Sequence, residues 1–291
     1  MWISIQNLII YALILGAIYL LISLGFSIIC GVLRIFHLGY AYIFPVTIYI
    51  TWMFMQEFGW GLIPSIFGMV AVQFLIAYLI YIAVIKRYME SELEMLISLL
   101  VITMIIEQVF NYFYPLQEGV YLKTTLIEGV VTFGSVVIPT QLVIGAIIAL
   151  VLTGLFVLFF IKTRIGLAIR AISQNIYSSQ IVGINVERLY IFTMMFVLIP
   201  VMIGTLLIAP VWTVDPWMGQ IYMSTAILAA VLGGLGNMKG TIMASFLIGA
   251  VHAFACFVLG EPRFMTLSAL LLVIVVLIVR PQGLTRSESL W

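Results

Sequence analysis

Few side chains in this chain can do chemistry, and the most conspicuous of them lie inside apolar stretches. Glu107, Gln108 and Asn111 all fall within the apolar run 94–113. Side chains four residues apart lie on one face of a helix, so Glu107 and Asn111 would point into a helix bundle together. An ionisable group inside a membrane span costs about 2.5–3.5 kcal/mol on insertion scales, which makes it a functional candidate. Two interpretations stay open: contact with a transported solute, and a structural hydrogen bond between helices.

The two histidines, His37 and His252, are candidates of the same kind. Each could titrate or contact a solute, or could instead hydrogen-bond a neighbouring helix. Because they are far apart in the sequence, a metal site built on histidine alone is not expected. Cys30 and Cys256 both fall in apolar spans, where a free cysteine behaves as a small hydrophobic residue rather than a disulfide partner. We therefore predict neither a metal nor a cofactor.

The sequence lacks the motifs of common enzymes. GGLGNMKG at 233–240 departs from the nucleotide-binding pattern G-x-x-x-x-G-K-[ST], because its spacing is wrong and no hydroxyl follows its lysine. No H-E-x-x-H, C-x-x-C or G-x-S-x-G occurs either. We expect that the chain is not an enzyme and that any ATP hydrolysis belongs to a partner chain.

The elements that position these residues belong to a chain whose main solvent is the lipid bilayer. Hydrophobic residues make up 65% of it and charged residues 8%, against about 25% charged in a soluble domain. The second and seventh apolar stretches are short and interrupted, by Pro45 and by Gly233, Gly234 and Gly236, so either could be broken or re-entrant. The predicted fold is all-α, a polytopic membrane helix bundle of about eight or nine transmembrane helices. It forms a single domain, 1–291. The nine candidate spans are approximately 6–30, 41–56, 62–85, 94–113, 141–161, 190–209, 221–235, 241–259 and 264–280.

Basic residues predict the orientation, because they collect on the cytoplasmic side of a membrane protein. With the N-terminus outside, Lys123 and Arg263 fall outside and ten of the twelve Lys and Arg residues fall inside. We predict a multi-pass protein of the cell membrane with its N-terminus outside and its C-terminus in the cytoplasm. No basic patch with interleaved aromatics is present, so no nucleic-acid partner is expected. The ten inside residues are Arg34, Lys86, Arg87, Lys162, Arg164, Arg170, Arg188, Lys239, Arg280 and Arg286.

The longest polar segment, 162–188, reads KTRIGLAIRAISQNIYSSQIVGINVER and carries four of the twelve basic residues. Its amphipathic pattern predicts a helix with polar groups opposite an apolar side. A basic, helical cytoplasmic loop in so hydrophobic a chain indicates a docking site for a soluble partner, hence a transporter subunit driven from outside itself. The apolar side would hold Ile169, Ile172, Ile176 and Ile181.

Two other regions interrupt the apolar pattern. The external loop 114–140 contains VVTFGSVVIPT, which is rich in β-branched residues and ends near Pro139, so a short hairpin is expected. The run 231–254 contains Gly233, Gly234 and Gly236, which allow a tight turn and close helix approach. It is either a cytoplasmic helical hairpin or a re-entrant element lining a solute path, and both descriptions can hold together.

Four blocks, taken in order and spacing, carry a resemblance to a known family. They are LILGAIYLLISLGFSIICGVLRI near the start, TRIGLAIRAISQNIYSSQIVGIN, VLGGLGNMKGT with LIGAVHAF, and the terminal RPQGL at 280–284. The chain resembles the inner-membrane permeases of branched-chain amino acid ABC transporters, the Liv-type group. In that family the second block sits on the ATPase subunit, which implies coupling roles in this sequence for Thr163, Arg164, Gly166, Arg170, Ala171, Asn175 and Gly183.

The chain departs from the family at positions expected to line the central pathway. After the first span the family usually has an N-[FL]-A-H-G-like motif, whereas this chain has HLGYAY, with His37, Tyr40 and Tyr42. Where the family often has Glu after L-L-G, this chain has His252. These departures bear on the solute rather than on the class of transporter. The candidate pathway residues are His37, Tyr40, Tyr42, Glu107, Gln108, Asn111, Gly233, Gly234, Gly236 and His252.

The function expected from the residues and the resemblance is that of an ABC importer permease for branched-chain amino acids or a similar small polar solute. Its expected partners are ATPase subunits, a second permease subunit (an identical or a related chain), an external solute-binding protein and the lipid bilayer. One alternative is a urea or short-amide permease of the same kind. Another is a self-sufficient small-solute channel, against which the docking segment argues. An integral membrane enzyme would need clustered polar groups, and those found are scattered.

Overall fold

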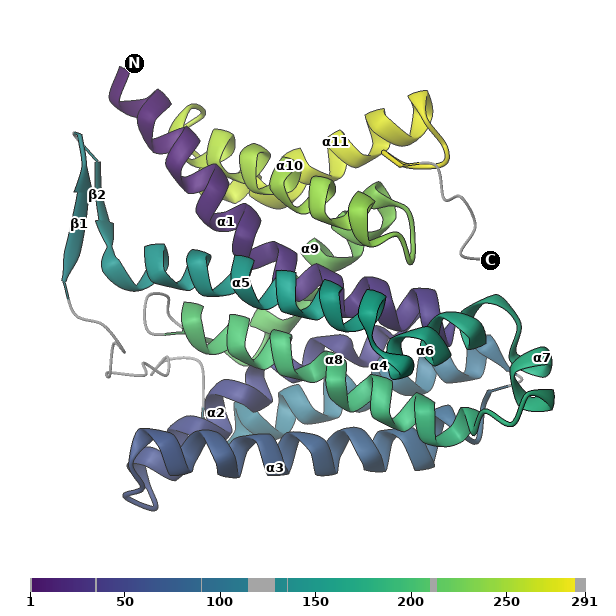
Figure 1. Ribbon diagram of the computed structural model, residues 1–291. Coiled ribbons are helices and arrows are strands. Elements are labelled where there is room, and N and C mark those ends of the chain that lie inside the picture. Colours follow the sequence, from purple (N-terminus) through teal and green to yellow (C-terminus); the bar gives the residue numbers. More distant parts are fainter. Residues whose placement is uncertain are drawn as a thin grey trace.

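The computed structural model describes residues 2–34, 36–89, 91–114, 129–134, 136–209 and 214–285. Within these ranges eight helices are long and apolar enough to cross a membrane, and they pack into one bundle (Figure 1). The predicted all-α polytopic fold is therefore confirmed. The helices of these eight spans are α1 (Trp2–Ile28), α2 (Ile43–Gln56), α3 (Leu62–Ile80), α4 (Glu92–Phe113), α5 (Thr140–Lys162), α8 (Val186–Ile208), α10 (Met238–Phe257) and α11 (Met265–Val279), and the shorter apolar helix α9 (Met218–Gly233) packs among them.

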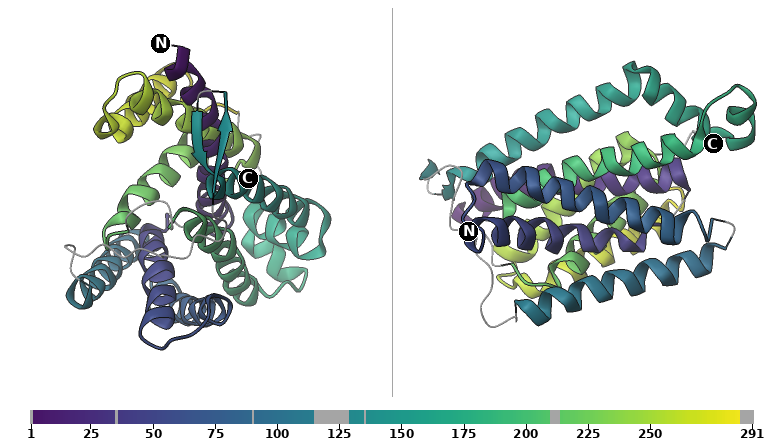
Figure 2. Two further views of the ribbon diagram at one scale, coloured as in Figure 1. Left: turned by 90° about the vertical axis from the view of Figure 1, so that its left-hand side faces the viewer. Right: turned by 90° about the horizontal axis from the view of Figure 1, so that it is seen from below.

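Helix α1 is the centre of the bundle. It packs against α5, α8, α9 and α10, and Figure 2 shows it between the α9–α11 group and the remaining helices. Its closest neighbour is α10, because glycines meet where the two helices cross. A Cβ placed on Gly249 would lie 2.5 Å from the backbone nitrogen of Gly16. Small residues at such crossings let helix backbones approach within van der Waals contact.

The second and seventh predicted spans are short, as expected, with helices of 14 and 16 residues. The second is a 3-10 turn, η2 (Leu38–Tyr42), followed by α2. The helix type changes at Ile43; Pro45 lies in the first turn of α2, where a missing N–H costs little. The seventh is α9, an apolar helix of 16 residues that ends at Gly233. Both α2 and α9 begin among buried residues. Gly219, in the first turn of α9, lies so close to Ala41 in η2 that a Cβ on residue 219 would clash with the Ala41 carbonyl oxygen.

The described part of the 114–140 loop forms the hairpin that its sequence predicts. Strand β1 (Val130–Phe133) pairs antiparallel with β2 (Val136–Pro139), with Val130 opposite Pro139. Gly134, next to its tip, lies near the Gln6 side chain at the start of α1. The hairpin thus extends the bundle at the end where the chain begins (Figure 1). Residues 115–128, including Lys123, lie outside the described residues.

Basic residues are segregated along the bundle. The ends of α1, α3, α5, α9 and α11 and the starts of α8 and α10 lie at one end, together with the short helices α6 (Arg164–Gln174) and α7 (Ile176–Ile181). We call this the basic end, because nine of the ten residues predicted to lie inside are found there. Arg263, in the short turn η5 (Pro262–Phe264), lies at the opposite end. The tenth, Arg286, lies outside the described residues.

Candidate functional site

The junction between α5 and α6 is a rigid elbow built by Thr163 and Gly166. The Thr163 hydroxyl accepts a hydrogen bond from the Gly166 N–H at 3.0 Å and donates one to the Phe159 carbonyl at 2.7 Å. It therefore caps the start of α6 and also binds the last turn of α5. A Cβ on Gly166 would lie 2.4 Å from the Phe160 carbonyl oxygen. Only glycine allows α6 to fold back this closely on α5.

Arg170, in the middle of α6, also stabilises the α5–α6 junction. Its Nη2 donates to the Ile161 carbonyl at 3.2 Å, one of the last carbonyls of α5, which have no partner within their own helix. The side chain is half-buried, and its Nε is without a hydrogen-bond partner in the described part of the chain. Arg164 is exposed, whereas Ala171 is half-buried on the same helix. Arg170 therefore lies along the bundle, while Arg164 faces away from it.

The polar segment is two helices, and the expectation of one shared isoleucine face is wrong. Asn175 leaves the helical conformation at φ −154°, ψ 111°, and its side chain caps α7 by accepting from the Ser178 N–H at 2.9 Å. The break rotates the second half of the segment relative to the first. Ile169 and Ile172 are buried, whereas Ile176 is 37% and Ile181 70% exposed.

Helix α7 consequently presents an apolar surface that the chain itself does not cover. Tyr177 is 72% exposed and Val182, just after the helix, is 80% exposed. Gly183 follows with φ +89° and turns the chain toward α8. We call the four residues Ile176, Tyr177, Ile181 and Val182 the α7 patch. Contiguous exposed apolar side chains of this kind mark sites of protein or membrane contact.

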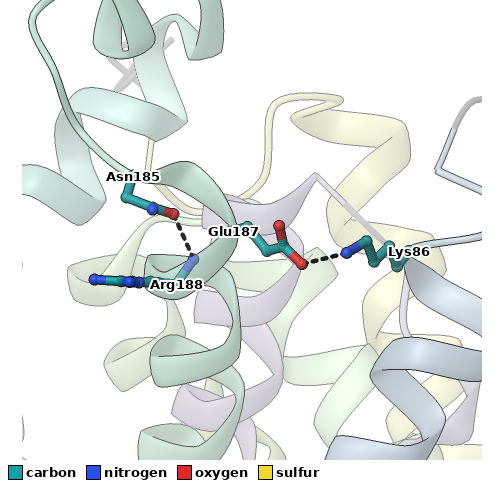
Figure 3. A network of polar contacts seen from close by, with 4 residues as sticks. All are labelled: Lys86, Asn185, Glu187 and Arg188. Atoms are coloured by element: carbon teal, nitrogen blue, oxygen red, sulfur yellow. Dashed lines mark hydrogen bonds and ion pairs between the residues drawn. The ribbon is translucent and has the colours of Figure 1, made fainter.

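The far end of the segment is tied to the bundle by polar contacts at the start of α8 (Figure 3). Asn185 caps this helix by accepting from the Arg188 N–H at 3.0 Å. Glu187, in its first turn, forms an ion pair with Lys86, which follows the π-helical turn η3 (Tyr81–Ile85) at the end of α3. The segment 163–188 is therefore anchored at both ends, with α7 projecting between them (Figure 1).

Glu107 is buried in α4 and makes its hydrogen bond to α9. The Gln220 side-chain amide donates to the Glu107 carboxylate at 2.9 Å. Asn111, one turn away, is half-buried, while Gln108 lies on the exposed face of α4. Gln220 is not among the residues predicted from the sequence, although an amide beside an apolar span was a usable signal. The structural hydrogen bond weighed for Glu107 is present, and its contact with a solute stays a prediction.

The HLGYAY segment contacts α4 and α9, the helices that carry Glu107 and Gln220. The turn η2 packs against both α4 and α9, and its Tyr40 hydroxyl donates to the Ile22 carbonyl of α1 at 2.6 Å. Gly25 leaves the space for this ring, since a Cβ there would lie 2.5 Å from the Tyr40 oxygen. Tyr42 is also fully buried. Tyr40, Tyr42, Glu107 and Gln220 thus occupy elements that meet around the starts of α2 and α9.

His37 precedes η2, between the spans Ile5–Gly31 and Leu38–Gln56. It is buried, and burial lowers the pKa of its imidazole to about 4 by disfavouring the charged form. The ring is therefore neutral at pH 7. Its Nδ1 has no hydrogen-bond partner within the described residues. His37 is thus a neutral ring with unused hydrogen-bonding capacity.

His252 lies elsewhere, between α10 and α1. Its Nδ1 is 2.9 Å from the Tyr19 hydroxyl, and the two rings meet edge to face at 5.2 Å. This is the contact expected of a histidine that joins neighbouring helices. The described residues contain no group of three His, Cys, Asp or Glu side chains that could hold a metal ion.

The glycine run forms the turn between α9 and α10 at the basic end, so the predicted helical hairpin is present. Gly234 and Gly236 have φ values of +95° and +80°. The chain after α11 packs directly onto this turn: Thr285 donates to the Gly233 carbonyl at 2.8 Å, and the Leu284 N–H donates to the Leu232 carbonyl at 2.8 Å. This contact of the RPQGL block with the glycine turn was not predicted from the sequence. Whether the turn lines a solute path stays a prediction.

Comparison with known proteins identifies the family. The family described as "Branched-chain amino acid transport system / permease component" matches residues 8–279. The chain belongs to this family. The matched residues include the α5–α6 junction, α7 and the elements around Glu107. The chain is therefore a multi-pass membrane permease component.

Curated relatives agree with this assignment at low identity. The high-affinity branched-chain amino acid transport system permease protein LivH of Salmonella typhimurium is 24% identical over 288 residues, 93% of this chain and 92% of that protein. The corresponding protein BraD of Pseudomonas aeruginosa is 29% identical over 167 residues, but the match spans about half of each, 55% of this chain and 54% of that protein. A probable LivH permease of Methanocaldococcus jannaschii is 24% identical over 237 residues, 77% of this chain and 73% of that protein. No solved structure matches the chain.

Proposed function

We propose that this permease is the membrane subunit of an ABC importer for branched-chain amino acids or a similar small polar solute. Separate ATPase subunits drive it, a second permease subunit completes the pathway, and an external protein delivers the solute. The whole chain acts as one membrane domain, with the basic end in the cytoplasm and the N-terminus outside. The names of the relatives support the solute class, and the segregation of basic residues supports the orientation.

The observation that carries the proposal is the α7 patch. It consists of apolar side chains on a six-residue helix, held away from the bundle by elements anchored on both sides. A channel that works alone has no use for such a surface. An ATPase subunit, in contrast, needs a rigid projection through which its closure on ATP can move the bundle. Thr163, Gly166 and Arg170 join α6 firmly to α5, and Asn175 and Gly183 set the position of α7.

The solute contacts are assigned to the elements around the starts of α2 and α9. There the Glu107–Gln220 pair, Tyr40 and Tyr42 meet at the junction of three elements. Short helices that begin inside a bundle are a recurring way for transporters to expose polar groups at the membrane centre. A carboxylate and a helix start supply complementary charge for the ammonium and carboxylate groups of an amino acid. His37 and Asn111 are secondary candidates in this region, and the role of Gln108, on the exposed face of α4, stays a prediction from the sequence.

Transport requires two states that the partners bind with different affinity. ATP-driven closure of the ATPase subunits pushes α7, and the elbow passes this movement to α5 and the bundle. The starts of α2 and α9 then separate toward the outside, and the delivered solute enters. Hydrolysis of ATP releases the ATPase subunits and returns the bundle to the inward-facing state. The permease contributes the contacts that differ between the two states.

The test of the docking assignment compares two exposed valines at opposite ends of the molecule. Val182 lies in the α7 patch, and Val137 lies in strand β2. Both are replaced by serine in an affinity-tagged chain, which is purified from its native membranes in mild detergent. We expect Val182→Ser, combined with Tyr177→Ser, to reduce recovery of the ATPase subunit about tenfold, because exposed aromatic anchors dominate interfaces. Val137→Ser serves as the matched control and keeps wild-type recovery. Recovery of the wild-type chain without any ATPase subunit would contradict the proposal.

The solute is tested separately in proteoliposomes that contain the co-purified complex. Uptake of labelled leucine is measured in competition with isoleucine and valine, and then with urea and short amides. Competition by the branched-chain amino acids alone supports the proposed solute class. Competition by urea or amides instead moves the assignment to an amide permease, and uptake without ATP moves it to a channel.

A further inference from the structure

Helix α1 ends in a π-helical turn, η1 (Ile29–Leu33), and Arg34 follows in the left-handed conformation at φ 53°, ψ 27°. Among the described residues Arg34 is the one non-glycine residue with a positive φ. A side chain crowds the backbone in this conformation, so it persists only where surrounding contacts hold it. Single π-helical turns of this kind are frequent at functional positions.

The contacts that hold Arg34 come from α6. Its Nη2 donates to the Ser173 carbonyl at 2.9 Å and lies 3.3 Å from the Gln174 carbonyl. These carbonyls are the last of α6, because Asn175 leaves the helix, and they have no partner within it. A cation there also meets the negative end of the helix dipole. Arg34 therefore caps α6 from a position 139 residues away in the chain.

The η1 turn also contacts the turn between α9 and α10 at the basic end. A Cβ on Gly31, in the middle of η1, would lie 2.5 Å from the Gly236 Cα in the α9–α10 turn. Turn η1 also lies against α6 and α8. One end of α1 thus contacts the coupling segment on one side and the glycine turn on the other. Farther along the same helix, the Ile22 carbonyl accepts the hydrogen bond from Tyr40.

We propose that Arg34 is the positioning residue that passes movement of α6 to α1, and through α1 to the solute-binding elements. The elbow at Thr163 holds the start of α6 to α5, and Arg34 holds its end to the central helix. Without this second attachment, α6 would pivot on the elbow and its end would move without α1. The proposal rests on the proposed function, because it assumes that α6 and α7 receive the ATPase.

Arg34→Gly is the decisive variant, because glycine adopts a positive φ without strain, so the hydrogen-bonding side chain is removed without disturbing this backbone conformation. Arg34→Lys keeps the positive charge but loses the planar guanidinium group, whose geometry allows hydrogen bonds to two carbonyls. Arg280→Ala is the control: it is an exposed arginine at the basic end whose side chain makes no hydrogen bond or ion pair within the described residues. Each chain is co-purified with its ATPase and second permease and reconstituted in proteoliposomes. Leucine uptake and ATP hydrolysis are measured in the same vesicles.

We expect Arg34→Gly to assemble and hydrolyse ATP like the wild type while leucine moved per ATP falls about tenfold, the size of a typical coupling between two sites. Arg34→Lys should lie between this variant and the wild type, and Arg280→Ala should match the wild type. A wild-type ratio in Arg34→Gly would overturn the role of Arg34 and leave the proposed function standing. Loss of the ATPase from Arg34→Gly would also overturn it, because Arg34 would then act in assembly. A wild-type chain that neither binds an ATPase nor transports would refute the proposed function itself.

Discussion

Helices α6 and α7 are adjacent in the sequence and both carry isoleucines, but they bury them to different extents. Helix α6 buries Ile169 and Ile172 and is fastened at both ends, by the Thr163 elbow and by Arg34. Helix α7 exposes Ile181 and Tyr177 and is held by the chain on either side of it. The difference separates two tasks that one amphipathic helix could not perform together. An anchored helix transmits force, and an exposed helix receives it.

The largest expected difference between the two helices is in the stability that their isoleucines contribute. Ile169→Ala should lower the free energy of unfolding by about 2–5 kcal/mol, because it leaves a cavity in a packed interior. Ile181→Ala should change it by less than about 0.5 kcal/mol, as surface substitutions usually do. Thermal unfolding in one detergent, followed by size-exclusion chromatography, measures both. Equal losses in the two variants would contradict the assignment of one helix as anchor and the other as free surface.

A smaller effect is expected at the elbow that makes α6 the anchor. Gly166→Ala should destabilise the chain by about 1–3 kcal/mol, because the added Cβ meets the Phe160 carbonyl and α6 must shift. Gly154→Ala is the matched control, since a Cβ at Gly154 in α5 would meet nothing within 4 Å. That control should stabilise the helix by up to about 1 kcal/mol. The same thermal assay applies, and a Gly166→Ala chain as stable as Gly154→Ala would show that the close approach is not required.

The smallest expected effect comes from the ion pair beyond α7. Lys86 and Glu187 are both solvent-accessible, so their interaction should contribute about 0.2–1 kcal/mol. A double-mutant cycle with Lys86→Ala and Glu187→Ala measures this coupling directly. The coupling should fade at about 1 M salt, where the screening length is about 3 Å. A coupling energy that is larger, or insensitive to salt, would mean that the chain after α7 is held to the bundle as tightly as α6.

Much of the fold follows from local patterns that the sequence displays. The eight long spans lie close to their predicted boundaries, and the short seventh stretch is α9. The VVTFGSVVIPT hairpin forms as its β-branched residues indicate. The break at Asn175 was missed, because the segment on either side keeps a helical pattern. Asn175, directly before the second helical stretch, was nevertheless a usable capping signal.

The candidate site was predicted less completely. The sequence identified Glu107 but not its partner Gln220, which comes from a helix more than a hundred positions later. It did not identify Tyr19 of α1 as the partner of His252, whose place in the pathway stays a prediction. It counted Arg34 among the basic residues and gave Arg170 a coupling role, but it did not predict that both donate to helix-end carbonyls. Partners of this kind are set by distances between segments, which no local pattern contains.

The sequence by itself determined the membrane-spanning class, the approximate bounds of the long apolar helices and the separation of basic from apolar regions. These properties are sums over consecutive residues, since a span is stabilised by the transfer of some 20 neighbouring side chains into lipid. Only the tertiary structure decided which face of each helix is covered. Ile169 and Ile181 are the same residue in the same polar segment, yet one packs against the bundle and the other meets solvent. Burial depends on what lies opposite a side chain, and that is fixed when distant helices pack together.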